Sequence, residues 1–129
     1  MERLALTASG ISGFVAVALG AFGTHGLKGR LEPLADAAKR LEWWNTAAQY
    51  QAIHALALGL VAVLAARNAS AALHVAAISF MVGTVLFSGS LYTMTLTGIR
   101  ALGAVTPFGG VAFLIGWASV AVAARGLRT

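Results

Sequence analysis

The chain has 129 residues, of which 59% are hydrophobic and only 10% are charged, with a formal net charge of +5 and no cysteine. A soluble domain carries about 25% charged residues, and a soluble chain this apolar would expose large adhesive patches. The composition therefore predicts an all-α integral membrane protein with one domain, residues 1–129. The absence of cysteine excludes disulfides and thiolate metal sites. The basic residues form no dense patch, so we expect them to meet lipid headgroups rather than nucleic acid.

Four long stretches without a formally charged residue predict four membrane-spanning helices. The stretches are 4–27, 43–66, 68–99 and 101–124. Because a spanning helix needs about 20 residues, we expect a four-transmembrane-helix bundle with helices at about 4–23, 46–66, 73–96 and 107–124. A cleaved signal peptide ending at Ala21-Phe22-Gly23 is the alternative for the first stretch, although its apolar run is long for that role.

Most of the charge lies between the first two predicted spans, in residues 28–45. Apolar residues recur there at helical spacing, namely Leu34, Ala37, Ala38, Leu41 and Trp44. This pattern predicts a short interfacial amphipathic helix at about 34–44, lying on the membrane surface with Trp43 and Trp44 at the headgroup boundary. Asn45 or Thr46 is then available as the N-cap of the next span. An ordinary solvated loop is the alternative.

Small residues line one face of the first predicted span and one face of the last. They are Ala8, Ser12, Ala16 and Gly20 in the first, and Gly109, Gly110, Ala112 and Gly116 in the last. Small residues let two helix backbones approach closely, which favours packing where lipid removes the hydrophobic drive. We expect these faces to pack within the chain or between copies in a homo-oligomer.

Polar side chains within the predicted spans form the candidate site. Polar groups at membrane depth are costly, so they need a partner or a task. Tyr50 and His54 share one face of the second span because they are four residues apart. The alternation of helix direction brings the end of the first span and part of the third span to a similar depth. The candidate cluster is therefore His25, Gln49, Tyr50, Gln51, His54, Ser88, Ser90 and Tyr92.

Three functions are compatible with this cluster. The polar groups can hydrogen-bond across helices and fix their packing, each bond contributing roughly 0.6–2 kcal/mol. They can instead bind or transport a small solute, an ion or a lipid, because polar residues inside membranes often mark pathways. His25 and His54 can act as ligands or as an acid–base pair, although the four spans contain no carboxylate and no sharp ligand spacing. We place the structural function first and nominate no catalytic residue, no metal ligand and no cofactor.

The distribution of basic residues bears on orientation. Four spans put both termini on one side of the membrane. That side carries Arg3, Arg67, Arg125 and Arg128, and the other carries Lys28, Arg30, Lys39, Arg40 and Arg100. The two sets are nearly balanced, but Arg67 and the C-terminal pair lie close to helix ends, where the positive-inside rule is strongest. We expect a multi-pass protein of the inner membrane with both termini in the cytoplasm and with membrane lipid as its partner.

Four short motifs follow one another along the chain. They are Gly20-Ala21-Phe22-Gly23-Thr24-His25-Gly26-Leu27, Tyr50-Gln51-Ala52-Ile53-His54-Ala55-Leu56, Leu86-Phe87-Ser88-Gly89-Ser90-Leu91-Tyr92, and Thr106-Pro107-Phe108-Gly109-Gly110 followed by Gly116-Trp117. Together they resemble the small bacterial membrane proteins grouped as domain of unknown function 423, which has animal relatives. The resemblance covers nearly the whole chain and implies a four-span inner-membrane protein with no established activity. The motif of that family has alanine where this chain has Thr24, so the resemblance assigns that hydroxyl no role.

Overall fold

The computed structural model describes residues 1–127, which form helices joined by short turns. The first span comprises α1 (Glu2–Phe22), a π-helical turn η1 (Gly23–Leu27) and α2 (Lys28–Leu31), and the second is α3 (Ala37–Arg67). The third comprises α4 (Ala71–Gly83), a π-helical turn η2 (Thr84–Ser88) and α5 (Gly89–Thr97). The last comprises a 3-10 helix η3 (Arg100–Ala104), α6 (Thr106–Ala123) and a 3-10 turn η4 (Ala124–Gly126). Arg128, one of the residues weighed for orientation, lies outside the described range.

Each of these four segments is long and apolar enough to cross a membrane. They extend over Glu2–Leu31, Ala37–Arg67, Ala71–Thr97 and Arg100–Gly126. No strand occurs in residues 1–127. The predicted all-α fold with four membrane spans is confirmed, and every predicted window lies within one of these segments.

The short surface helix predicted at 34–44 is not a separate element. Residues 32–36 form a turn, and α3 then continues without a break from Ala37 to Arg67. The cause is local: Pro33 opposes continuation of the preceding helix, whereas no glycine or proline interrupts residues 37–58. Asn45 therefore lies inside α3 and caps nothing. The first span likewise extends beyond the expected end at residue 23, because η1 keeps the chain helical as far as Leu31.

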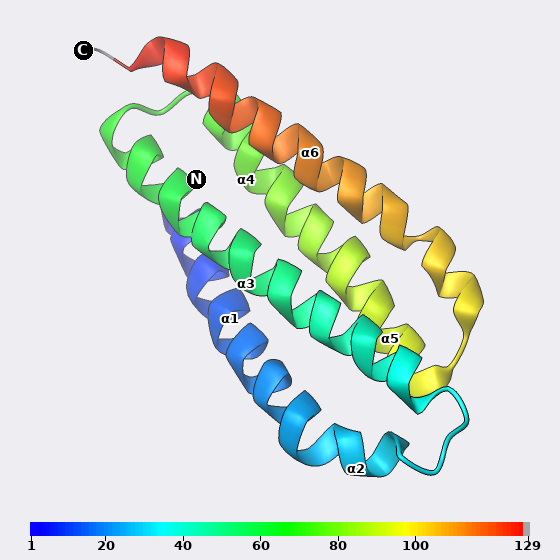
Figure 1. Ribbon diagram of the computed structural model, residues 1–129. Helices are drawn as coiled ribbons and strands as arrows, with labels where there is room; N and C mark the ends of the chain where they lie inside the picture. Colours follow the sequence, from blue (N-terminus) through cyan, green and yellow to red (C-terminus); the bar gives the residue numbers. More distant parts are fainter. Residues whose placement is uncertain (128–129) are drawn as a thin grey trace.

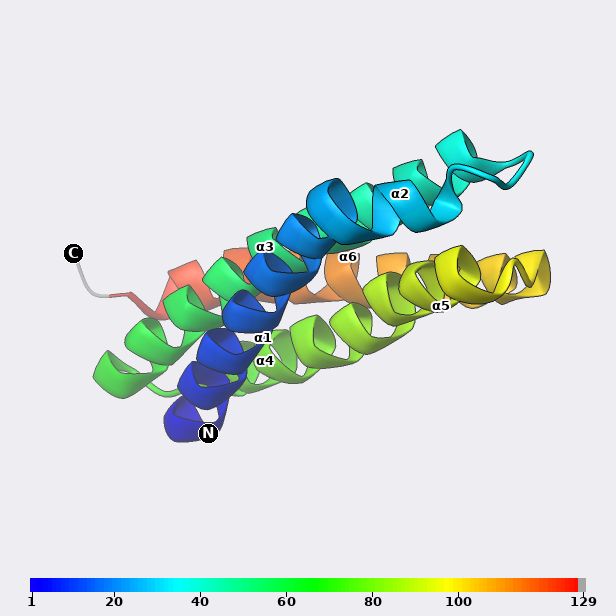
Figure 2. The same ribbon diagram turned by 90° about the horizontal axis from the view of Figure 1, so that it is seen from below.

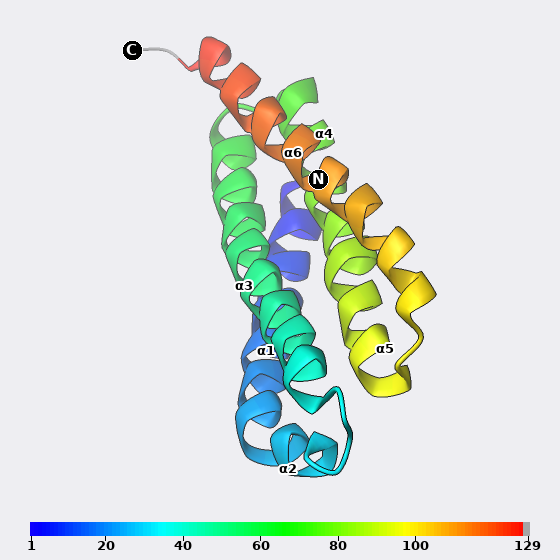
Figure 3. The same cartoon turned by 45° about the vertical axis from the view of Figure 1, so that its right-hand side comes forward.

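The four spans are arranged as two pairs that meet side by side (Figure 1, Figure 2). In one pair α1 packs along α3, and in the other α6 packs along α4. Contacts of α3 with α4, η2 and α5 join the pairs, as the turned view in Figure 3 shows. The α3–α4 turn and both ends of the described chain lie at one end of the molecule, and α2 and η3 lie at the other (Figure 1). α3 is thus the central helix.

Small residues allow the close helix packing that the sequence predicts, and they do so within the chain. A Cβ atom placed at Gly13 would lie 3.8 Å from the Cβ of Ala55, so the first span sits closely against α3. In the other pair, a Cβ atom at Gly116 would overlap the ring of Phe80, and one at Gly109 would overlap the backbone of Phe87. Most of the small faces of α1 and α6 is therefore covered by α3 and by the α4–η2 segment, whereas Gly110 is only partly covered.

A charged junction fastens the start of α3 to the end of α5. Arg40 donates from Nε to the Asp36 carboxylate at 3.0 Å and from Nη1 to the Thr95 carbonyl at 3.2 Å. Arg100 approaches the same carboxylate at 3.7 Å. Gly98 ends α5 with φ of +72°, a left-handed conformation that glycine adopts readily. The sequence pattern places this charged segment at the membrane surface. It does not predict the contact between Arg40 and the third span.

Candidate functional site

His54 lies near the middle of the membrane-spanning part of α3. With a rise of 1.5 Å per residue, it is about 16 Å along the axis from Trp43 and about 20 Å from Arg67. Its side chain is only 3% exposed. A polar ring at this depth has no water to satisfy it, so its partners must come from the protein.

Both ring nitrogens of His54 have such partners. Nε2 accepts a hydrogen bond from the Trp117 indole at 3.1 Å, and Nδ1 lies 2.7 Å from the carbonyl oxygen of Tyr50. Because the indole can only donate, Nε2 carries no proton and Nδ1 donates its proton to the carbonyl. The ring is therefore uncharged, and a metal or haem iron could bind at Nε2 only by displacing Trp117. Residues 1–127 contain no group of three or more His, Asp or Glu side chains placed to hold a metal ion.

Aromatic rings from three spans surround the His54 ring. Phe113 stacks on it with centroids 3.5 Å apart and planes inclined by 6°, and Phe80 lies 5.5 Å away. Tyr50 stacks 6.2 Å away on the neighbouring turn of α3 and contacts Phe87 at 4.6 Å. These rings place His54 where α3, α4 and α6 meet.

Gln51 is the centre of a second network on the other side of α3. Its Nε2 donates to the Ser12 carbonyl of α1 at 3.1 Å, and its Oε1 accepts from the Tyr92 hydroxyl of α5 at 2.7 Å. One amide therefore connects three spans. Ser88 adds a further link by donating to the Ala47 carbonyl at 2.8 Å.

Several residues that hydrogen-bond between the spans were not part of the candidate cluster. Trp44 donates its indole N–H to the Leu19 carbonyl at 2.7 Å, and Thr106 shares a hydrogen bond of 2.6 Å with Ser90. Trp117, the partner of His54, was named only as the end of the fourth sequence motif. A general signal existed, because a buried indole N–H usually finds a hydrogen-bond acceptor.

The structure divides the predicted cluster. Gln51, His54, Ser88 and Ser90 are buried, and Tyr92 is partly buried. His25 is exposed and lies outside both networks, so the expectation that α1 meets the cluster near His25 is wrong. The reason is the register between the first span and α3. Gln51 lies level with Ser12, about three and a half helical turns before His25 along the first span. Gln49 is exposed and Tyr50 is 40% exposed, although the sequence places Tyr50 on the same helix face as the buried His54.

Gln49 and Tyr50 face a groove of about 630 Å³ between α3 and α6. The groove lies on the flank of α3 opposite α1, since the two sets of contacting residues lie on opposite sides of the helix. Its floor is the aromatic cluster with His54. Eleven residues line it: Gln49, Tyr50, Ile53, His54, Phe87, Pro107, Gly110, Val111, Phe113, Leu114 and Trp117.

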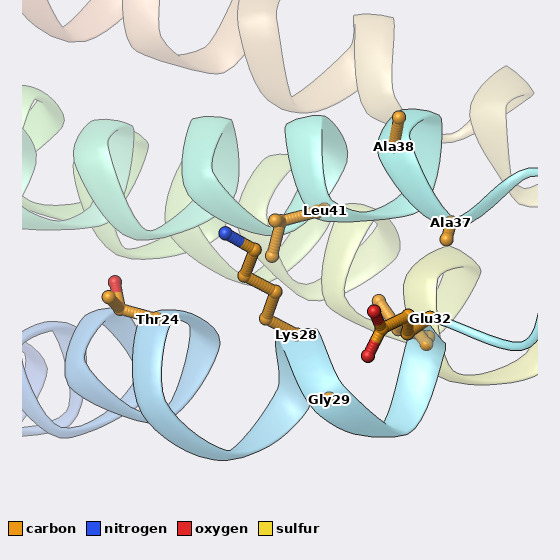
Figure 4. A pocket seen from close by; sticks show the side chains of 8 residues that line it. Thr24, Lys28, Gly29, Glu32, Ala37, Ala38 and Leu41 are labelled. Atoms are coloured by element: carbon orange, nitrogen blue, oxygen red, sulfur yellow. The ribbon is translucent and has the colours of Figure 1, made fainter.

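Another cavity, of about 460 Å³, lies between the end of the first span and the start of α3. Figure 4 shows Lys28 extending from the first span toward α3 beside Leu41, with Glu32 at the far end of the same segment. Thr24 also lines this cavity, and His25 does not. Its charged residues place it at the polar end of the molecule, away from the His54 network.

Comparisons with known proteins agree that this is a membrane protein. Residues 19–110 match the family model described as "Protein of unknown function (DUF423)". The chain is 46% identical over 115 residues to "UPF0382 membrane protein YwdK" of Bacillus subtilis (strain 168), covering 88% of this chain and 89% of that protein. It is 43% identical over 127 residues to "UPF0382 inner membrane protein YgdD" of Escherichia coli (strain K12), covering 98% of this chain and 93% of that one. No solved structure matches the chain. The chain therefore belongs to the DUF423 family of membrane proteins, as its four motifs indicate.

Proposed function

We propose that this protein binds a lipid-like amphiphile of the bilayer in the groove between α3 and α6, and that the polar cluster beside the groove is structural. One observation carries the proposal. The groove contains two polar side chains, Gln49 and Tyr50, that the protein leaves exposed at membrane depth, whereas Gln51 and His54 are satisfied internally.

The structural half of the proposal is supported by how fully the buried polar groups are used. Both ends of the Gln51 amide are hydrogen-bonded, as are both nitrogens of His54. Ser88 and Ser90 also bond to groups of the protein. A site that had to bind an ion or solute through these same atoms would have to break bonds that hold three spans together.

The binding half is supported by the size and position of the groove. Its volume of about 630 Å³ lies within the range of about 300–1,000 Å³ typical of ligand sites. It opens toward the surroundings of α3 and α6, where exposed apolar side chains such as Leu56 and Val111 face the acyl chains. Exposed polar atoms in that setting are costly unless something with hydrogen-bonding groups covers them. A bilayer amphiphile can supply such groups and enter sideways from the membrane.

The experiment fills the groove without touching the polar network. Gly110 lines the groove, and a Cβ atom there meets only Phe87, at 4.0 Å. Gly110→Trp should therefore fold and occupy the ligand space. Gly10→Trp is the matched control, because Gly10 is exposed on α1 with nothing within 4 Å of an added Cβ. Native mass spectrometry of protein extracted from membranes should show bound lipid on the parent and on Gly10→Trp. Equal lipid retention by Gly110→Trp would refute binding in the groove.

We also propose that the protein resides in the inner membrane with both termini in the cytoplasm. The name of the E. coli relative supports the membrane assignment, and Arg67 at the end of α3 supports the orientation. Reporter fusions after Arg67 and after Thr129 should both report the cytoplasm. A periplasmic signal from both fusions would reverse the orientation.

A homo-oligomer would use surfaces other than the small faces, because α3 and the α4–η2 segment cover those.

A further inference from the structure

The groove between α3 and α6 has no charged side chain among its lining residues. His54 adds no charge either, because its Nε2 accepts a hydrogen bond from the Trp117 indole N–H and its Nδ1 donates to the Tyr50 carbonyl. An ionised group brought into such surroundings would lose its hydration without gaining a counter-ion, which is strongly unfavourable. The lining therefore selects against a ligand that buries a charged head here.

The charged side chains at the Trp43 end of α3 and around it lie outside the groove. Arg40 and Arg100 both approach Asp36, at 3.0 and 3.7 Å. Lys39 lies 3.4 Å from Glu42. Lys28 lines the separate cavity between the first span and α3 (Figure 4). None of these cations lines the groove, so the protein presents no positive site for a phosphate within it.

The polar atoms of the groove are gathered toward one end of it. Gln49 and Tyr50 lie about one helical turn before His54 on α3, toward the Trp43 end of the span, and Pro107 lies at the corresponding start of α6. Leu114 and Trp117 line the part nearer the membrane centre. The Gln49 amide can donate and accept hydrogen bonds, and so can the Tyr50 hydroxyl. The groove is thus polar toward the membrane surface and apolar toward the centre, which matches the direction in which a lipid lies in one leaflet.

We infer that the ligand is an uncharged lipid whose head carries hydroxyl or carbonyl groups. Its head binds at Gln49 and Tyr50, and its chain lies along Ile53 and Leu114 toward Trp117. This inference rests on the proposed binding function and narrows it to one chemical class. The aromatic floor adds apolar contact along the length of the chain.

Two probes with the same acyl chains test the inference directly. Dioleoylglycerol has an uncharged hydroxyl head, and dioleoylphosphatidic acid differs from it only by the phosphate. Titrated into delipidated protein and followed by native mass spectrometry, dioleoylglycerol should bind at least about tenfold more tightly, a difference that one uncompensated polar interaction readily produces.

Variants locate the binding head. Gln49→Leu should weaken dioleoylglycerol binding by about tenfold, because it removes the amide and keeps the side-chain volume similar. Asn45→Leu is the control, since Asn45 is an exposed polar residue of α3 one turn earlier that does not line the groove. Leu114→Trp, a second filling variant on α6, should abolish binding of the same probe.

The outcomes separate the two claims. Phosphatidic acid that binds as tightly as dioleoylglycerol, and that is lost in Leu114→Trp, would overturn the uncharged head and keep the groove. Loss of that binding in Arg100→Gln would then assign the phosphate to Arg100. Failure of both probes to bind, or binding that Leu114→Trp and Gly110→Trp leave intact, would overturn the groove function together with this inference.

Discussion

The indole nitrogen of Trp117 lies 3.1 Å from Nε2 of His54 and connects α6 to α3 near the centre of the membrane. Phe113 of α6 also stacks on the His54 ring at this level, with centroids 3.5 Å apart, and the groove lies beside these contacts. His54 passes the connection on through Nδ1 to the Tyr50 carbonyl, one turn back along its own helix. The hydrogen bond and the stacked Phe113 ring together link α3 to α6 beside the groove where the ligand is proposed to lie.

The energetic coupling between these two rings can be measured with a double-mutant cycle. His54→Phe and Trp117→Phe each remove one partner and keep an aromatic ring. We expect a coupling of about 0.6–1.7 kcal/mol, the range found for hydrogen bonds between membrane helices. Denaturant unfolding in detergent micelles measures it. A second cycle that combines His54→Phe with Trp43→Phe is the control, because Trp43 contacts Arg100 rather than His54. Strictly additive effects of His54→Phe and Trp117→Phe would contradict the bond.

The Gln51 network gives an independent expectation. Tyr92→Phe removes the hydroxyl that donates to Gln51 Oε1 and leaves that buried acceptor unsatisfied. We expect a loss of about 1 kcal/mol in the free energy of unfolding. Thr93→Val is the control, because Thr93 is exposed and its hydroxyl donates to the Gly89 carbonyl of its own helix segment. A loss as large in Thr93→Val as in Tyr92→Phe would mean that the interhelical bond contributes nothing.

The fold was predictable because its determinants lie in composition and helical spacing. Apolar windows define the four spans, and the glycines of α6 mark the face that Phe80 and Phe87 occupy. The proximity of Gln51 to Tyr92 followed from helix direction and from the cost of unpaired polar groups in hydrocarbon. These properties depend on one helix at a time, or on which way neighbouring helices run.

The parts of the site that the sequence does not predict depend on how each helix is rotated about its axis and how far neighbouring helices are displaced along each other. The sequence does not show that Trp117 rather than another α6 residue points at His54. The same limit explains the error at His25. Helix direction predicts a similar depth for His25 and the cluster, but the register of the two helices puts Ser12 beside Gln51. The sequence does not predict the groove either. The groove exists because α6 packs along α4 and leaves one flank of α3 open.

Packing of α6 against η2 should tolerate no side chain at Gly109. A Cβ atom there would overlap the backbone nitrogen of Phe87, which cannot move by a rotamer change. We expect Gly109→Ala to lower the free energy of unfolding by about 1–3 kcal/mol, as overpacking of a tight core does. Gly10→Ala, at an open position, should instead leave stability unchanged or raise it by up to about 1 kcal/mol. Thermal unfolding of both variants in the same detergent measures the difference. An unchanged thermal midpoint in Gly109→Ala would disprove the close approach of α6 and η2.

The junction at Asp36 should make stability depend on pH in the acidic range. The hydrogen bond from Arg40, with a further contribution from the Arg100 charge, holds the pKa of the Asp36 carboxyl below its ordinary value. Since the folded state binds this proton less readily than the unfolded state, the stabilisation is complete above about pH 4 and is lost as the pH falls through the lowered pKa.

Protonation removes the charge that Arg40 and Arg100 share, so the contact between the start of α3 and the end of α5 weakens. We expect the thermal midpoint of the parent protein to fall as the pH drops below about 4, and the fall to be smaller in Asp36→Asn, which lacks the carboxylate at every pH. Glu32→Gln removes an exposed carboxylate of the same turn and should leave the acid dependence as in the parent. An Asp36→Asn profile parallel to that of the parent would show that this carboxylate does not hold the junction.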